Sequence, residues 1–121
     1  MLKDLIAIRE FLTSPESWTQ DVVARNKFDI PVYSDSREAA KFCLLGAVQH
    51  ITGVYYKAES ILRLLQDITG YPDIVRWNDE LHRQHEEVLD LLDKAIILQR
   101  SRQERYLSLK EPVKEQVLED A

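Results

Sequence analysis

One apolar run in the middle of this 121-residue chain constrains the fold more than any other feature. Its apolar side chains recur three and four positions apart, the spacing of one face of an α-helix. The positions are Ala40, Cys43, Leu44, Ala47, Val48 and Ile51. Phe42 and Leu45 add apolar surface beyond that face, which is typical of a helix covered on several sides. The sequence therefore predicts a central helix that follows a capping box at residues 35–38 and ends at Gly53.

Gly46 lies inside this predicted helix. Glycine in a helix interior costs up to about 1 kcal/mol relative to alanine, so a compensating contact is expected. The usual compensation is a backbone or a large ring that packs directly against the glycine. We therefore expect Gly46→Leu to unfold the domain and Gly46→Ala to be tolerated.

Three other segments have helical spacing. The first, residues 1–12, ends before Pro15, because proline disfavours a helical residue before it. The second ends at Gly70, and the third begins either near Asn78 or as late as Gln84. Their apolar positions are Leu2, Leu5, Ile6, Ile8 and Leu12; Ala58, Ile61, Leu62, Leu65 and Ile68; and Leu81, Val88, Leu89, Leu92, Ala95 and Ile96.

Residues 18–33 have a different pattern, because Phe28, Ile30 and Val32 alternate with polar residues or proline. This alternation predicts a short β-hairpin. Pro31 would confine the second strand to a sheet edge, because proline has no backbone N–H to donate. The predicted fold is thus mostly α, a compact bundle of four to five helices with a short hairpin between the first and second helices.

The chain is expected to form one helical domain over residues 1–100, followed by a polar tail over residues 101–121. A thin apolar stripe runs through this tail at Tyr106, Leu109, Val113 and Val117, and Pro112 is expected to break it. Two interpretations remain open. The tail is either a frayed polar end or a helix that docks on the body or on a second copy.

Composition narrows the functional classes. With 16 basic and 21 acidic residues, the formal charge of −5 disfavours general nucleic-acid binding, although Arg100, Arg102 and Arg105 could form a local basic patch. One cysteine cannot form an internal disulfide, which fits a reducing compartment. The charged N-terminus does not resemble a signal peptide, and no apolar run is long enough to span a membrane. We expect a cytoplasmic protein that needs no cofactor.

Cys43 and His50 are candidates for nucleophilic catalysis, because seven residues place them on roughly the same face of the predicted helix. Cys43, however, lies in the centre of the apolar stripe. Burial there would raise the pKa of the thiol and block access to it. The pattern therefore favours an inert core cysteine.

His82, His85 and Glu86 are the candidates for a metal site. On a helix, spacings of three and four would place all three on one face, and two imidazoles with a carboxylate suit zinc or iron. The spacing matches no established metal motif. We favour a hydrogen-bonded histidine at the edge of the core, because His85 continues the apolar stripe toward Val88.

Trp77, Asn78 and Asp79 have two interpretations. A polar pair beside an indole could line a binding pocket. Asn and Asp are also frequent helix caps, and a tryptophan can anchor the adjoining turn in the core. We favour the second interpretation and expect Asn78 or Asp79 to cap the last helix.

Six short motifs lie in order between residues 18 and 97 and carry a family resemblance: residues 18–20 (Trp-Thr-Gln), 24–25 (Ala-Arg), 31–32 (Pro-Val), 39–47, 77–79 (Trp-Asn-Asp) and 86–95. They resemble an uncharacterised family of small bacterial and phage proteins, known as a domain of unknown function. Phe42 stands where that family has tryptophan, and Gln84 stands where a threonine is expected to open the last helix. The resemblance implies a compact, mostly helical domain and supplies no catalytic residue.

Two functional hypotheses follow. The first is a non-enzymatic binding or regulatory protein that acts through protein–protein contacts or self-association. A phage or mobile-element origin would direct it at a host factor. The second is a small metal-dependent or thiol enzyme that uses His82, His85 and Glu86, or Cys43.

Overall fold

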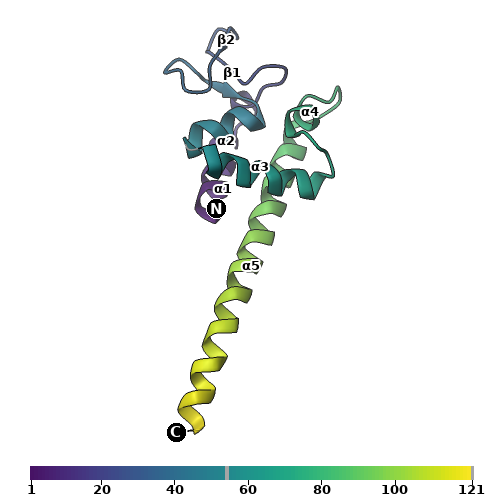
Figure 1. Ribbon diagram of the computed structural model, residues 1–121. Coiled ribbons are helices and arrows are strands. Elements are labelled where there is room, and N and C mark those ends of the chain that lie inside the picture. The colour runs from purple at the N-terminus through teal and green to yellow at the C-terminus, as the bar shows by residue number, and fades with distance from the viewer. Residues whose placement is uncertain (54, 121) are drawn as a thin grey trace.

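The computed structural model describes residues 1–53 and 55–120, with side chains up to Leu109 (Figure 1). In this part of the chain five α-helices and a small antiparallel sheet form a mostly helical protein, as predicted. The helices are α1 (Leu2–Phe11), α2 (Leu44–Thr52), α3 (Tyr55–Thr69), α4 (Ile74–Asn78) and α5 (His85–Asp120), with a 3₁₀ turn, η1, at Pro15–Ser17.

The sheet contains the predicted hairpin. Strands β1 (Ala24–Arg25) and β2 (Pro31–Val32) pair antiparallel, and their turn is closed by Asn26, whose Oδ1 accepts hydrogen bonds from the backbone N–H groups of Phe28 and Ile30. A third strand, β3 (Lys41–Phe42), pairs with the other side of β1, so the strand order is β2-β1-β3 and Pro31 lies on an edge strand, as expected for a residue without a backbone donor.

The third strand, β3 (Lys41–Phe42), corrects the sequence analysis. Residues 35–42 were predicted as a capping box and the start of a helix, but α2 begins only at Leu44. The backbone explains the difference, because Ala40 donates to the carbonyl of Arg25, and β3 pairs with β1. Ala40 is exposed, whereas Phe42 is buried. The apolar pattern of residues 40–43 is therefore produced by a short extended segment rather than by a helical face.

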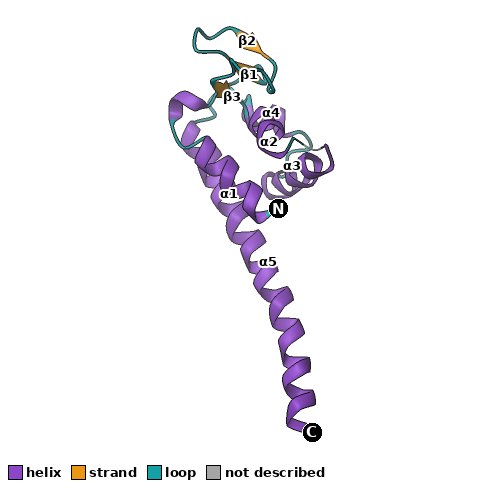
Figure 2. Ribbon diagram, turned by 90° about the vertical axis from the view of Figure 1, so that its left-hand side faces the viewer, coloured by secondary structure: helices purple, strands orange, loops and turns teal. Residues whose placement is uncertain are grey.

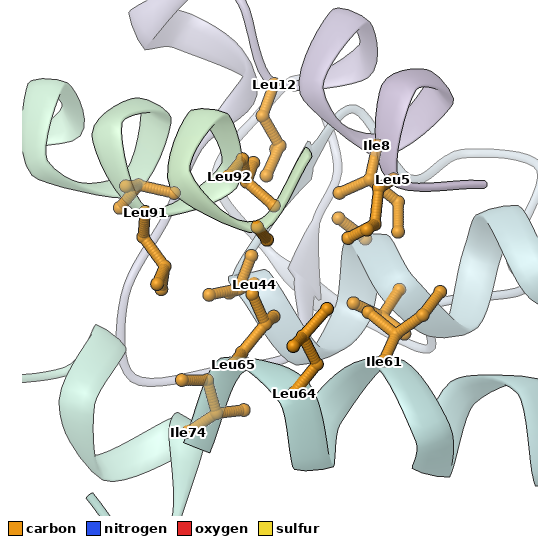
Figure 3. Packing of buried hydrophobic residues seen from close by; sticks show 14 of the residues in the cluster. Leu5, Ile8, Leu12, Leu44, Ile61, Leu64, Leu65, Ile74, Leu91 and Leu92 are labelled. Carbon is orange, nitrogen blue, oxygen red and sulfur yellow. The ribbon is translucent and has the colours of Figure 1, made fainter. Parts of the chain in front are cut away.

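The core lies around α2, which packs against α1, α3 and α4. Figure 3 shows Leu44 of α2 between Leu65 of α3 and Leu92 of α5. Leu44, Leu65 and Leu92 are each 0% exposed. The predicted central position of this helix is thus confirmed, although the helix is shorter than expected.

The helix ends follow local sequence signals. Gly53 and Gly70, which follow α2 and α3, have φ values of 58° and 75°, a left-handed conformation that glycine adopts without strain. Helix α5 begins at His85, the later of the two predicted starts. The predicted break at Pro112 is wrong, because α5 continues to Asp120 and extends far beyond the body (Figures 1 and 2).

Candidate functional site

Neither Asn78 nor Asp79 caps the last helix, contrary to the sequence-based prediction, because α5 begins only at His85. Asn78 is the final residue of α4, a helix whose N-terminus is capped by Asp73, and it is 0% exposed. Its side-chain oxygen accepts hydrogen bonds from the indole N–H of Trp18, at 2.8 Å, and from the backbone N–H of Leu44, at 3.1 Å. Asn78 therefore provides a hydrogen-bond acceptor for the first residue of a helix, but that helix is α2.

The amide nitrogen of Asn78 completes this buried network. It donates to the carbonyl of Thr19, at 3.2 Å, and to the carboxylate of Asp79, at 2.9 Å. Asp79 also accepts from the backbone N–H of Asp21, and Gln20 donates to the carbonyl of Asn78. Residues 18–21 are thus hydrogen-bonded to residues 78–79. The side chain of Asn78 has no exposed surface on which a ligand could bind.

Trp77 is also part of the body, with 7% of its surface exposed. The guanidinium of Arg83 lies 4.0 Å from the centroid of the indole, and its Nε donates to the carbonyl of Trp77. Arg83 in turn forms an ion pair with Glu87, at 2.9 Å. Trp77 thus connects α4 to the first turn of α5.

Cys43 is 2% exposed and lies at the N-cap of α2, just before the helix rather than in the centre of its apolar face. Its sulfur accepts a hydrogen bond from the backbone N–H of Gly46, at 3.3 Å. Burial raises the pKa of the thiol. His50, the proposed catalytic partner, instead donates from Nδ1 to the carbonyl of Ser34, at 2.9 Å.

Gly46 has the close backbone contact that its sequence position predicts. A Cβ atom added to Gly46 would overlap the carbonyl oxygen of Val23. That oxygen also accepts a hydrogen bond from the backbone N–H of Cys43, so it cannot move away without cost. The expectation that alanine would be tolerated here is therefore wrong, because even a methyl group finds no space.

His82, His85 and Glu86 do not share a helical face, because α5 begins only at His85. His82 is exposed in the preceding turn, and Glu86 is exposed in the first turn of the helix. His85 is half-buried, and its Nε2 donates to the carbonyl of Leu12, at 2.6 Å, beyond the last turn of α1. Among the described residues no group of three His, Cys, Asp or Glu side chains could hold a metal ion.

A surface groove between three segments was missed by the sequence analysis. It has a volume of about 570 Å³ and lies between the loop after β2, helix α2 and the start of α3. Tyr33 and Tyr55 line it and are 81% and 83% exposed. The other lining residues are Ser34, Asp35, Leu45, Gln49, Thr52, Gly53, Ala58, Glu59 and Leu62. We call this surface the tyrosine groove.

The loop that carries Tyr33 is held against α2 by its neighbour. The hydroxyl of Ser34 donates to the side-chain oxygen of Gln49, at 3.0 Å, and the carbonyl of Ser34 accepts from His50. The imidazole of His50 stacks on Phe11, with ring centroids 5.1 Å apart. Tyr33 is therefore presented by an anchored segment of backbone.

The charges in the tyrosine groove are acidic. Asp35 and Glu59 contribute carboxylates, and Glu59 also lies 3.5 Å from Arg63 in an exposed ion pair. Aromatic faces attract cations through the ring quadrupole, and carboxylates attract them by charge. Two tyrosines with two carboxylates therefore form a surface that suits a cationic group, such as the guanidinium of an arginine.

Most of the chain matches a known protein family. Residues 2–98 match the model described as "Family of unknown function (DUF6197)". The chain belongs to the DUF6197 family. No curated protein and no solved structure matches the chain at a significant level. The DUF6197 match contains the whole Asn78 network and the tyrosine groove, and it ends at residue 98, in the first half of α5. In the described part of the chain, no helix is both long and apolar enough to cross a membrane.

Proposed function

We propose that this DUF6197 protein is a non-enzymatic binding protein that recognises a partner protein through the tyrosine groove. The observation that carries the proposal is the pairing of two highly exposed tyrosines with two carboxylates in one hollow. Tyrosine is enriched at protein interfaces because it offers a large, stiff contact area with a polar end. The carboxylates select the chemistry of the partner, which is a protein segment that presents an arginine or a lysine.

The charge of the whole chain supports the same partner class. The formal net charge is −5, so a basic partner is attracted over longer distances before it reaches the groove. The resemblance to bacterial and phage proteins leads us to propose a phage or mobile-element origin, and a host-cell protein as the target. We place this interaction in the cytoplasm, where the buried thiol of Cys43 would remain reduced.

The alternative class, a metal-dependent or thiol enzyme, receives less support from the side chains that would carry it. Cys43 is buried and caps a helix, and His85 is engaged with the carbonyl of Leu12. His82 and Glu86 are exposed and belong to different local structures. We therefore favour the binding protein over the enzyme.

The first experiment measures whether the groove takes a guanidinium. The probe is an acetylated and amidated Gly-Arg-Gly peptide, titrated into the ¹⁵N-labelled protein and followed by NMR. We expect shifts of the backbone amides of Tyr33, Gln49 and Tyr55. The same peptide with citrulline, which has nearly the same shape without the charge, should cause much smaller shifts. Equal responses to the two peptides would contradict the cationic specificity.

Tyrosine-to-alanine variants test whether the arginine peptide binds in the tyrosine groove. Tyr55→Ala should weaken binding of the arginine peptide about two- to fivefold, because a cation–π contact at an exposed site contributes about 0.5–1 kcal/mol. Tyr56→Ala is the matched control, since Tyr56 is the next residue, is 67% exposed and does not line the groove. A natural partner captured from host cells should be lost with Tyr33→Ala/Tyr55→Ala and kept with Tyr56→Ala. Retention by the double variant would overturn the proposal.

A further inference from the structure

Beyond the body, α5 is exposed up to residue 109, the last residue whose side chain the structure describes. Up to Ile96 the helix packs against α1 and α3, with Val88, Leu92 and Ala95 each 0% exposed. Leu98 still packs partly against the core, and beyond it α5 leaves the body (Figures 1 and 2); all nine residues from 101 to 109 are exposed. Leu107 and Leu109 expose 54% and 71% of their surface to water. We call residues 99–120 the α5 extension.

Such a helix needs support from packing. Most helical stability in proteins comes from burial of one face, and single helices in water are marginal. Pro112 adds a further cost, because it lacks the N–H that would bond the carbonyl four residues earlier. The exposed leucines and the interior proline both indicate that another surface covers the α5 extension when it is helical.

The sequence of the α5 extension separates the two signs of charge. Residues 100–110 contain four basic side chains and one acidic side chain, which is a formal charge of +3; they are Arg100, Arg102, Arg105, Lys110 and Glu104. Residues 111–120 contain four acidic side chains and one basic side chain, which is −3; they are Glu111, Glu115, Glu119, Asp120 and Lys114. The helix therefore has a basic half next to the body and an acidic half at its far end.

We propose that the α5 extension pairs antiparallel with the α5 extension of a second copy of this chain. Antiparallel pairing places the basic half of each helix beside the acidic half of the other, whereas parallel pairing would place like charges together. A two-fold axis near residues 110 and 111 sets Arg102 at the level of residue 119 of the second copy and Arg105 near residue 115. The proposal is independent of the tyrosine groove.

Apolar residues lie near that axis. Leu109 is one helical turn before Val113, so both can contribute to a seam in the middle of the pair. The seam is short, so much of the specificity comes from charge. Exposed charge pairs are screened by salt, and dimerisation should therefore weaken as ionic strength rises.

The test measures the mass of the full-length protein by sedimentation equilibrium at low and high salt. One variant reverses the basic half with Arg100→Glu, Arg102→Glu and Arg105→Glu, and a second reverses the acidic half with Glu111→Lys, Glu115→Lys and Glu119→Lys. Each variant alone should raise the dimer dissociation constant at least about tenfold, since several attractive charge pairs are replaced by repulsion. A one-to-one mixture of the two variants should form a heterodimer.

A matched control separates the interface from net charge. Reversal of three exposed basic residues on the body changes the charge by the same amount and should leave the dimer intact: Lys27→Glu, Arg37→Glu and Lys57→Glu. The relative orientation of the two α5 extensions is determined by disulfide cross-linking. A Gln103→Cys chain should cross-link to a Leu118→Cys chain but not to another copy of itself, and buried Cys43 should not compete.

Three results would overturn the proposal. The first is a full-length protein that stays monomeric at millimolar concentration and low salt. The second is a dimer that both reversal variants leave unchanged. The third is self-cross-linking of the Gln103→Cys chain without cross-linking to the Leu118→Cys chain, which would indicate parallel pairing.

Discussion

The side-chain oxygen of Asn78 accepts the backbone N–H of Leu44, 34 residues earlier in the chain, at 3.1 Å. Leu44 is the first residue of α2, and the first N–H groups of a helix have no partner within the helix. Asn78, at the end of α4, supplies one of the missing acceptors. The start of the central helix is therefore defined by a residue of a different helix.

Removal of this side chain should strongly destabilise the protein. Asn78→Ala leaves the buried N–H of Leu44 and the indole N–H of Trp18 without their acceptor, and each such loss costs about 1–3 kcal/mol. We expect a decrease of roughly 2–5 kcal/mol in the free energy of unfolding, measured by urea titration. Trp18→Phe removes one donor and leaves the bond to Leu44, so it should cost less. Equal stabilities for Asn78→Ala and the wild type would contradict this account.

Gly46→Ala should destabilise the protein, although alanine normally favours a helix. The added Cβ would overlap the carbonyl oxygen of Val23, so the segment just before β1 or helix α2 would have to shift. Overpacking of a tight interior typically destabilises a protein by about 1–3 kcal/mol. The higher helix propensity of alanine over glycine offsets less than about 1 kcal/mol of this loss. Thermal unfolding followed by circular dichroism should show a lower melting temperature. Ala47→Gly, on the next residue, provides a comparison in which a methyl group is removed instead, and a melting temperature of Gly46→Ala at or above that of the wild type would refute the clash.

The long periodic segments of the sequence were sufficient to predict α1, α3 and the buried half of α5, because each buries one face and repeats its apolar residues accordingly. The region before α2 was not predictable in this way. Residues 40–43 have helical spacing in the sequence, yet pairing of β3 with β1 holds them extended. A strand of two residues is too short to produce a periodic signal, so its conformation depends on tertiary contacts that sequence spacing does not contain.

The candidate sites were also only partly predictable from the sequence. Residues 18–20 and 77–79 stood out as separate motifs, but no local rule indicates that Trp18 and Asn78 form a hydrogen bond. The tyrosine groove was missed because Tyr33 and Tyr55 come from two segments, and exposed tyrosines repeat with no period. A signal was present in Tyr33, which follows the last alternating apolar residue of the predicted hairpin, because binding residues are disproportionately found where a loop begins.

Cys43 should react slowly with thiol reagents in the native protein. Its thiol is 2% exposed, and burial raises its pKa, so both access and the thiolate fraction are reduced. Labelling with a chromogenic disulfide should be slow in buffer and fast in denaturing urea, and it should remain slow at pH 8.5, where a free cysteine is about half ionised. Rapid native labelling would place the thiol on an accessible surface.

Glu87 should contribute to the acid sensitivity of the fold. Its pKa lies below the ordinary value because its carboxylate accepts the backbone N–H of Gln84 and lies beside Arg83. The unfolded state therefore binds a proton more readily, so the stabilisation is present above the ordinary carboxyl pKa and is lost as pH falls through the lower folded value. Unfolding free energies measured from pH 6 to pH 3 should decrease less in Glu87→Gln than in the wild type. Glu86→Gln is the neighbouring control, and identical pH profiles for all three proteins would contradict the assignment.

Gln84→Thr should stabilise the start of α5. Gln84 is the residue just before the helix, and Glu87, three residues later, already accepts its backbone N–H at 2.9 Å. That bond is one half of a capping box, whose other half is a Ser or Thr side chain that accepts the N–H of the third helical residue. A threonine at position 84 would supply this missing half to the N–H of Glu87, which here donates to the backbone carbonyl of Gln84, at 3.0 Å. N-cap substitutions of this kind change stability by about 0.5–2 kcal/mol, so we expect a higher melting temperature for Gln84→Thr.

Two control variants test whether the hydroxyl of the introduced threonine is responsible. Gln84→Val, which has nearly the shape of threonine without the hydroxyl, should not raise the melting temperature. The double variant Gln84→Thr/Glu87→Ala should lose part of the gain. An equal gain for Gln84→Val and Gln84→Thr would mean that the hydroxyl does not cap α5.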